Sequence, residues 1–199
     1  MIKRIDIIED RSLWEQFLAG DDKAYAYFYK KYIEELFSYG MRFTHDRELV
    51  KDCIQDVFVR IYSHRATLGK TDNVRFYLYM ALKNTLFNVF QKDKSLYHID
   101  TMEPVFQTEY TIEDRLISDE LQQEQKEKMK QILEALSPRQ KEVIYYRYVE
   151  DMGIDEICKL MDMNYQSVQN LIQRSIRKIR NTFKEKESVM SIKPISRCL

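Results

Sequence analysis

The segment ELVKDCIQDVFVRIY, residues 48–62, places apolar side chains at the three- and four-residue spacing of an α-helix. Two further segments, 21–43 and about 74–91, carry apolar residues at similar spacing, and the second of them is apolar on most sides. Alternating apolar and polar runs, as strands require, are missing, and the chain contains only four Gly and three Pro. The sequence therefore predicts an all-α fold.

The chain divides into two helical parts and a polar connection. Residues 1–92 hold the three helical segments, and residues 127–186 hold a second helical group. Between them, residues 93–126 lose the apolar pattern and contain nine acidic and two basic residues up to Gln125. This composition predicts an acidic linker that turns helical toward its end. Residues 187–199 are short and polar, and we expect a disordered tail there.

Helix ends are well marked, beginning with Asp21, which can cap the first of the three segments. In LSPRQKEV, Ser137 can cap a helix, the next residue is a proline that suits the first helical position, and Gln140 completes a capping box. Gly153 separates this helix from IDEICKLM, and residues 162–164 form a three-residue turn whose Asn caps the last helix. Two helices joined by a short turn, the second longer and basic, predict a helix-turn-helix.

The last helix has two contrasting faces. One face is expected to pack on the two preceding helices and comprises Val168, Leu171, Ile172, Ser175, Ile176, Ile179 and Phe183. Amides near the start of the other face can pair with adenine edges in a major groove, and cations further along can neutralise phosphates. The net charge of the chain is zero, so such binding must be local. The expected DNA-binding residues are Tyr165, Gln166, Ser167, Gln169, Asn170, Gln173, Arg174, Arg177, Lys178 and Arg180.

The segment 48–62 carries a second surface, opposite its apolar face. That apolar face comprises Leu49, Val50, Cys53, Ile54, Val57, Phe58, Ile61 and Tyr62, and the opposite stripe comprises Glu48, Asp52, Gln55, Asp56 and Val59. An acidic stripe with an aliphatic residue in it suggests a basic or amphipathic helical partner. A solvated face is the alternative, and the pattern alone leaves both open.

The segment 74–91 has a less apolar side with hydrogen-bonding groups beside an aromatic ring. This side comprises Tyr77, Ala81, Asn84, Thr85, Asn88 and Gln91, and it ends in Lys92 and Lys94. Neutral hydrogen-bonding groups next to an aromatic ring suit unstacked bases better than duplex phosphates. Taken alone, this is a weak signal.

Three segments together carry a family resemblance. In order, ELVKDCIQDVFVRIY, VRFYLYMALKNTLFNVFQK and SPRQKEVIYYRYVEDMGIDEICKLMDMNYQSVQNLIQRSIRKIR resemble the two conserved regions of bacterial RNA polymerase sigma factors of the extracytoplasmic-function group of the sigma-70 family. The resemblance covers roughly residues 20–183. It implies a sigma region 2 bundle over 1–92 and a sigma region 4 helix-turn-helix over 127–186, joined by the acidic linker.

The resemblance also implies partners and residue roles. Asp52, Gln55 and Asp56 match positions that dock on a coiled coil of core RNA polymerase. The third helix, together with the preceding loop SHRATLGKTDNVR, would capture melted non-template bases of the minus-ten element, with Lys83 and Asn84 matching a basic-plus-Asn pair. The last helix would read the minus-thirty-five element of promoter DNA, the linker would thread a basic channel of the polymerase, and an anti-sigma factor would bind the chain. The residues expected on the melted element are Tyr77, Lys83, Asn84, Asn88 and Lys92.

Three departures from the family pattern bear on these expectations. Asp162 stands where the turn usually has Gly, and Asp tolerates the left-handed conformation better than most residues. Gln169, Asn170 and the leucine that follows replace a more basic or hydroxylic stretch, which affects the promoter sequence rather than the fold. Met80 stands where a basic residue is common, so one DNA contact is missing there.

Two other classes of protein are alternatives to a sigma factor. A LuxR-type helix-turn-helix regulator that binds duplex DNA without polymerase fits SPRQKEVI, but its first half is usually an α/β receiver or ligand-sensing domain. An enzyme would need a catalytic motif, and the sequence has no Gly-rich phosphate loop or nucleophile motif. We therefore expect no enzymatic activity, no cofactor and no small-molecule substrate.

Cysteine and histidine usage adds an expectation about the metal content and location. The three Cys are isolated, which fits a reducing cytoplasm and argues against a zinc site. His45, His64 and His98 are scattered, and we expect them on the surface or in loops. The N-terminus has no signal-peptide pattern, and no segment reaches the length of a membrane span. These features predict a cytoplasmic protein.

Overall fold

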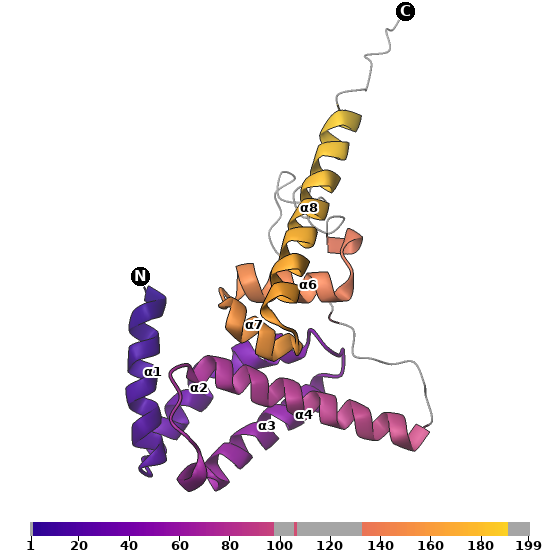
Figure 1. Cartoon of the computed structure of the whole chain (residues 1–199). Coiled ribbons are helices and arrows are strands. Elements are labelled where there is room, and N and C mark those ends of the chain that lie inside the picture. Colours follow the sequence, from indigo (N-terminus) through magenta and orange to yellow (C-terminus); the bar gives the residue numbers. More distant parts are fainter. Residues whose placement is uncertain (1, 98–105, 107–132, 191–199) are drawn as a thin grey trace, which may run out of the picture. The chain divides into compact units, whose positions relative to one another are not determined.

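The computed structural model describes residues 2–97, 106 and 133–190, and all regular structure in these residues is helical (Figure 1). The chain separates into two compact units, Met1–Val105 and Phe106–Leu199. The first contains α1 (Ile2–Leu18), α2 (Asp22–Gly40), α3 (Arg47–Ser63), the 3₁₀ helix η1 (Arg65–Thr67) and α4 (Val74–Tyr97). The second contains α6 (Pro138–Ile144), the π-helical segment η3 (Tyr145–Val149), α7 (Ile154–Met161) and α8 (Tyr165–Met190). The predicted all-α fold is confirmed.

Helices of the first unit begin at capping residues. The Asp21 side chain accepts a hydrogen bond from the Lys23 backbone N–H at 2.8 Å, as the sequence predicts. Asp46 accepts from two backbone N–H groups at the start of α3, at 3.1 and 3.0 Å. Asn73 accepts from the Phe76 N–H at 3.0 Å and so opens α4. Each cap satisfies amides that have no partner within the helix.

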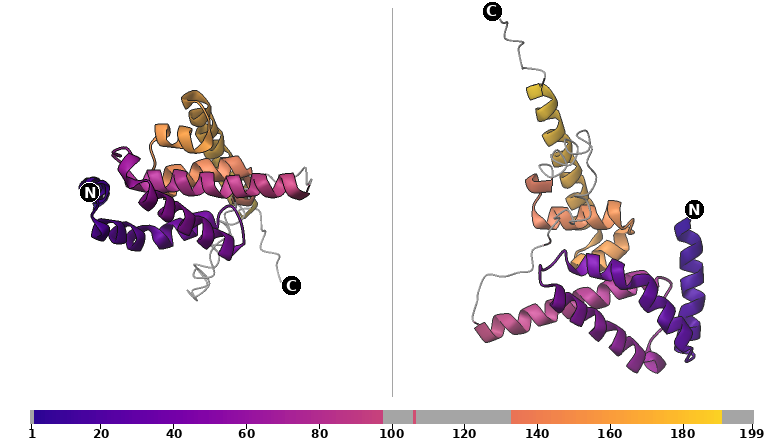
Figure 2. Two further views of the ribbon diagram at one scale, coloured as in Figure 1. Left: turned by 90° about the horizontal axis from the view of Figure 1, so that it is seen from below. Right: turned by 180° about the vertical axis from the view of Figure 1, so that it is seen from behind.

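The core of the first unit lies where α2, α3 and α4 pack together. Figure 2 shows α1 against the start of α4 and the C-terminal end of α4 projecting from the bundle. The predicted apolar face of α3 is buried at Val50, Cys53, Ile54, Val57, Phe58 and Ile61. At its two ends the prediction was too broad, because Leu49 is only half-buried and Tyr62 is 39% exposed. From α4, Leu78, Leu82 and Leu86 are fully buried. Because these side chains recur at helical spacing, each helix buries one continuous stripe.

The structure corrects several sequence expectations for this unit. Helix α1 was not predicted, and α4 continues to Tyr97 instead of ending near Gln91. In α2, Tyr27 and Phe37 were expected in the apolar stripe, but both are only half-buried. Tyr39 of α2 is instead fully buried, with its ring stacked at 4.3 Å from another tyrosine ring. Aromatic residues on several faces of α2 had obscured its buried stripe.

In the second unit, the capping box at the start of α6 forms as predicted. The Gln140 N–H donates to the Ser137 hydroxyl at 3.3 Å, and the Ser137 N–H donates to the Gln140 side chain at 3.0 Å. Helices α6 and α7 both pack on α8. Phe106 is 2% exposed, and its ring lies 5.3 Å from that of Tyr145.

Beyond the end of α4, the described part of the expected acidic linker is Phe106. This residue packs within the second unit. The rest of that linker beyond Tyr97, at 98–105 and 107–132, lies outside the described residues. Helix α8 continues to Met190, past the position where the tail was expected to begin. Residues 191–199 also lie outside the described range.

Candidate functional site

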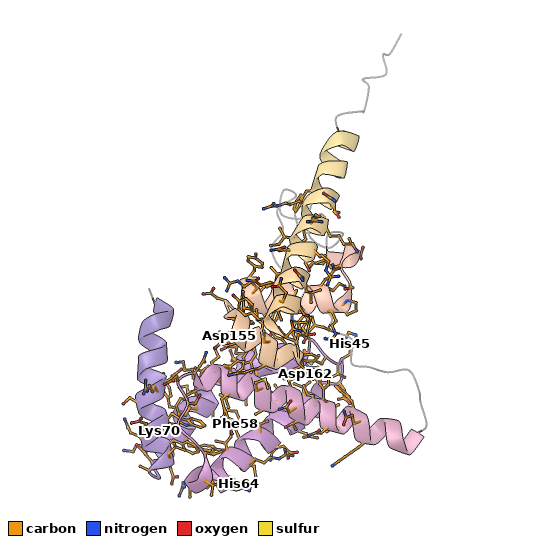
Figure 3. All side chains as sticks on the ribbon, viewed as in Figure 1. His45, Phe58, His64, Lys70, Asp155 and Asp162 are labelled. Carbon is orange, nitrogen blue, oxygen red and sulfur yellow. The ribbon has the colours of Figure 1, made fainter. Side chains whose placement is uncertain are left out.

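A tight turn sets the direction of α8. Asp162, between α7 and α8, has φ 51° and ψ 54°, the left-handed conformation expected for the position that usually holds Gly (Figure 3). The Asn164 side chain accepts a hydrogen bond from the Ser167 N–H at 2.8 Å and caps α8. The predicted three-residue turn and its cap are both confirmed. This geometry fixes where the first residues of α8 point.

The packing face of α8 is buried at Val168, Leu171, Ile172 and Ser175, as predicted. The Ser175 hydroxyl donates to the Leu171 carbonyl oxygen at 2.7 Å, so this buried polar group is satisfied within the helix. Ile176 and Ile179 are half-buried, and Phe183 is 43% exposed. The C-terminal half of α8 runs beyond α6 and α7 in Figure 1, and the burial decreases accordingly.

The opposite face of α8 presents amides first and cations later. The Gln166 amide donates to the Asn170 side-chain oxygen at 3.2 Å, and the Gln169 amide donates to the Tyr165 hydroxyl at 3.2 Å. Most predicted residues are exposed, namely Tyr165, Gln166, Asn170, Gln173, Arg174, Arg177, Lys178 and Arg180, while Ser167 and Gln169 are half-buried. This arrangement can offer hydrogen-bonding groups to base edges from the first two turns and positive charge to phosphates from later turns.

The acidic stripe of α3 is fully on the surface. Glu48, Asp52, Gln55, Asp56 and Val59 are all exposed, and Val59 is 52% exposed despite its apolar side chain. Glu48 forms an exposed ion pair with Lys51 at 2.7 Å, which contributes little to stability. The structure therefore brings the five predicted residues together on one face.

The stripe also affects a thiol on the buried side of α3. Burial raises the pKa of the Cys53 thiol to about 11, and the neighbouring carboxylates of Asp56 and Asp52 add to this effect. Phe58, also on the buried side, packs its ring 5.0 Å from that of Tyr29 on α2 and is labelled in Figure 3. The apolar and acidic faces of α3 are thus distinct, with the apolar one directed into the unit.

On α4, four of the five residues predicted to contact melted bases lie along one side. Asn84, Asn88 and Lys92 are exposed at four-residue intervals, and Tyr77 lies two turns earlier on the same side. Tyr77 is half-buried because its ring packs 5.4 Å from that of Trp14 on α1. Sequence reasoning missed Trp14, because nothing in the local pattern indicates a contact across more than 60 residues.

The structure does not bring Lys83 to this side of α4. Lys83 is 8% exposed, and its ammonium group lies 5.6 Å from the Phe43 ring centroid and 5.3 Å from that of Phe87. One residue before Asn84, it points about 100° round the helix. Thr85 is also buried and donates its hydroxyl hydrogen to the Ala81 carbonyl oxygen at 2.9 Å. The expected basic-plus-Asn pair therefore offers only its Asn at the surface.

The described residues show neither a metal-binding cluster nor a membrane-spanning helix. No group of three His, Cys, Asp or Glu side chains there is arranged to hold a metal ion. No helix in the described part of the chain is both long and apolar enough to cross a bilayer. His45 and His64 are exposed, as expected, and His98 lies outside the described range.

Comparison with known proteins gives matches in both units. A family model described as "Sigma-70 region 2" matches residues 28–95, and one described as "Sigma-70, region 4" matches residues 126–179. The RNA polymerase sigma factor YlaC of Bacillus subtilis (strain 168) is 25% identical over 149 residues, which are 74% of this chain and 84% of YlaC.

Two solved structures share the fold. CnrH, in complex with the cytosolic domain of CnrY, has a TM-score of 0.56 at 16% identity and is covered over 97% of its length, with 88% of this chain. The sigma factor RpoE from Bartonella quintana, in complex with the anti-sigma factor NepR, has a TM-score of 0.53 at 15% identity, covering 79% of this chain and 96% of RpoE. At these identities, the likeness concerns the fold.

The two sigma-region matches lie in the predicted order and together cover more than half of the chain. The region 2 match favours a sigma factor over the LuxR-type regulator, which was the alternative for the helix-turn-helix. The chain belongs to the sigma-70 family of RNA polymerase sigma factors, as a member of its extracytoplasmic-function group.

Proposed function

We propose that this sigma factor uses three separate surfaces to direct core RNA polymerase to promoters and to open them. The acidic stripe of α3 binds the polymerase, the polar side of α4 captures melted bases, and the polar face of α8 reads the upstream promoter element. The main support for this proposal is that α3 and α8 each have a buried apolar face and an exposed polar face. Helix α3 buries most of its apolar side, and α8 buries the first half of its apolar side. Each helix presents a chemically distinct polar side.

For the α3 surface, charge and shape favour a basic, amphipathic partner helix. Asp52 and Asp56 supply negative charge, Gln55 supplies hydrogen bonds, and the exposed Val59 supplies an apolar contact. Such complementarity favours specificity and fast association. A partner helix that covered the stripe would also bury Val59, which is 52% exposed in the free chain.

For the α4 surface, the Tyr77 ring provides a stacking platform, and the Asn84 and Asn88 amides can hydrogen-bond the edges of unstacked bases. Lys92 follows on the same side and can neutralise a phosphate. No reactive group is required, because capture of a base outside the stack depends on stacking and hydrogen bonding alone. Lys83 is left out of this proposal because of its burial.

For partners and location, the two similar structures, each solved as a complex, support one further proposal. CnrH binds the cytosolic domain of CnrY, and RpoE binds the anti-sigma factor NepR. We infer that this chain likewise has an anti-sigma partner. As a transcription initiation factor, it works beside polymerase and DNA in the cytoplasm, and it needs no enzymatic activity or small-molecule substrate.

Strand opening in the presence and absence of core polymerase tests the proposal. The probe is a duplex fragment that the chain selects from genomic DNA when assembled with core polymerase. The purified chain alone should bind this duplex weakly at physiological salt, whereas the assembled complex should make unpaired thymines reactive to permanganate. Tight, specific binding by the chain alone, with no opening on adding polymerase, would contradict the proposed division of work.

Charge reversal tests the polymerase surface separately. Asp52→Lys combined with Asp56→Lys should abolish co-purification with core polymerase and leave the helical circular dichroism unchanged, since both side chains are exposed. Glu34→Lys, at an exposed position of α2, is the control and should co-purify normally. Loss of helical signal in the double variant would mean that the stripe has a structural role instead.

A further inference from the structure

We propose that Trp14 of α1 is a positioning residue for promoter opening, and that it holds the loop before α4 and the Tyr77 ring in the arrangement that captures melted bases. The inference rests on the proposed role of α4. It concerns a helix that lies outside the sigma region 2 match, which begins at residue 28.

The contact between Trp14 and the loop is a partly buried hydrogen bond. Trp14 is 1% exposed, and its indole Nε1–H donates to the Gly69 carbonyl oxygen at 3.1 Å. A buried indole N–H needs an acceptor, and here the acceptor belongs to the backbone of the loop. The loop is therefore attached to the core of the unit at Gly69, although residues 68–73 form no helix.

Two ion pairs reinforce this attachment from the same side of α1. Glu15 pairs with Lys70 at 3.0 Å, and Arg11 pairs with Asp72 at 3.0 Å. Arg11, Trp14 and Glu15 are three and four residues apart and so share one face of α1. Lys70 lies beside α1 in Figure 3. Both pairs are exposed and individually weak, so the indole contact is the main constraint.

The same indole ring fixes Tyr77. Their ring centroids lie 5.4 Å apart at an interplanar angle of 58°, and burial raises the pKa of the Tyr77 hydroxyl. Because one side of Tyr77 packs on Trp14, its ring cannot rotate freely, and the exposed part stays available for a base. Trp14 thus contacts both the loop and the aromatic residue of the proposed capture surface.

Preordering of the loop has a direct consequence for binding. A loop that is already fixed loses less conformational entropy when it binds bases than one that must become ordered. Weakening the Trp14 contact should therefore reduce affinity for melted bases. Binding of core polymerase through α3 should not change, because Trp14 is not part of the exposed α3 stripe.

The test compares Trp14→Phe with the wild-type chain, each assembled with core polymerase. The probe is the strongest single-stranded binder that the wild-type complex takes from a randomised oligonucleotide pool. Phe keeps the ring packing and removes only the N–H donor, so affinity for the probe should fall by about threefold to tenfold. Ile54→Val, a change in the core on α3, is the control and should bind the probe like the wild type.

A second substitution separates loop ordering from general loss of structure. Gly69→Ala meets no atom within 4 Å and reduces the freedom of the unbound loop. In the Trp14→Phe background it should restore part of the lost affinity, and hydrogen exchange of the loop amides should slow in parallel. Rescue of this kind is not expected if Trp14 merely stabilises the unit.

Three results would overturn the inference. These are wild-type affinity in Trp14→Phe, weaker binding of core polymerase by that variant, and no rescue by Gly69→Ala. Failure of the proposed base capture by α4 would give a different result. If Tyr77→Ala and Asn84→Ala both leave probe affinity unchanged, α4 does not capture bases, whatever Trp14 does.

Discussion

Gly40 lies where α2 packs tightly against Val50 of α3, and replacing it with Ala should destabilise the first unit. A Cβ atom at Gly40 would lie 2.6 Å from Cγ1 of Val50 and 3.6 Å from Cδ2 of Leu82. Val50 is 0% exposed, so its side chain cannot move aside into solvent. Overpacking of this kind costs about 1–3 kcal/mol, and the better helix propensity of Ala offsets about 0.5–1 kcal/mol. We expect a net loss of about 0.5–2 kcal/mol.

The single tryptophan of the chain makes this loss measurable for the first unit alone. Trp14 is buried in that unit, so urea unfolding followed by tryptophan fluorescence reports on it without a contribution from the second unit. The midpoint should move to lower urea at an unchanged slope. A variant that is as stable as the wild type, or more stable, would contradict the close approach.

A double-mutant cycle identifies the contact responsible. Val50→Ala alone should cost about 2 kcal/mol through lost burial and a small cavity. With Gly40→Ala in addition, the new methyl group occupies space that Val50 has vacated, so the double variant should be about 1–2 kcal/mol more stable than the sum of the single losses predicts. Additivity within about 0.5 kcal/mol would refute a steric conflict between these residues.

Three further predictions concern DNA reading, the turn and pH. Ala substitution of Gln169 or Asn170 should weaken promoter binding by about 1–3 kcal/mol and relax the preference at one base pair. Arg177→Ala should instead weaken binding to all sequences equally and reduce the slope of log affinity against log salt concentration by about 0.9. Competition assays at several salt concentrations can measure both effects. Asp162→Val should destabilise the second unit by about 1–2 kcal/mol in urea unfolding, because φ is 51°, while Asp162→Gly should not. Because folding raises the pKa of the Cys53 thiol from about 9 to about 11, it contributes stability that is lost as pH rises through this range, and Cys53→Ala should show a shallower loss by tryptophan fluorescence.

Local signals in the sequence were sufficient for several elements. The buried face of α3 follows from apolar spacing alone, because a long amphipathic helix has one way to bury its stripe. The caps at Asp21, Ser137 and Asn164 were also predicted, since each depends on a side chain and a backbone amide a few residues away. The left-handed turn at Asp162 was expected from the same kind of local argument.

Long-range pairing accounts for what the sequence did not reveal. Asp10 in α1 is buried because Lys31 binds its carboxylate at 2.6 Å and the Tyr32 hydroxyl donates to it. A charge at that position looks like surface, so α1 gave no clear apolar face. Lys83 was misread in the same way, since its ammonium group lies over two aromatic rings in the interior. Such burial depends on partners that no local pattern specifies.

The amide face of α8 explains why specific reading should depend on polymerase. Gln166 and Asn170 already hydrogen-bond each other, and Gln169 bonds Tyr165, so contact with a base edge replaces an existing bond and yields a modest net gain. The free chain has zero net charge, so attraction of the duplex to α8 depends on local cations such as those of α8 itself. Core polymerase bound through the proposed α3 surface would raise the effective concentration of both proposed DNA-binding surfaces at the promoter, which can multiply weak affinities without any new contact. Weak individual contacts therefore favour a sigma factor that acts on promoters only when it is assembled with polymerase.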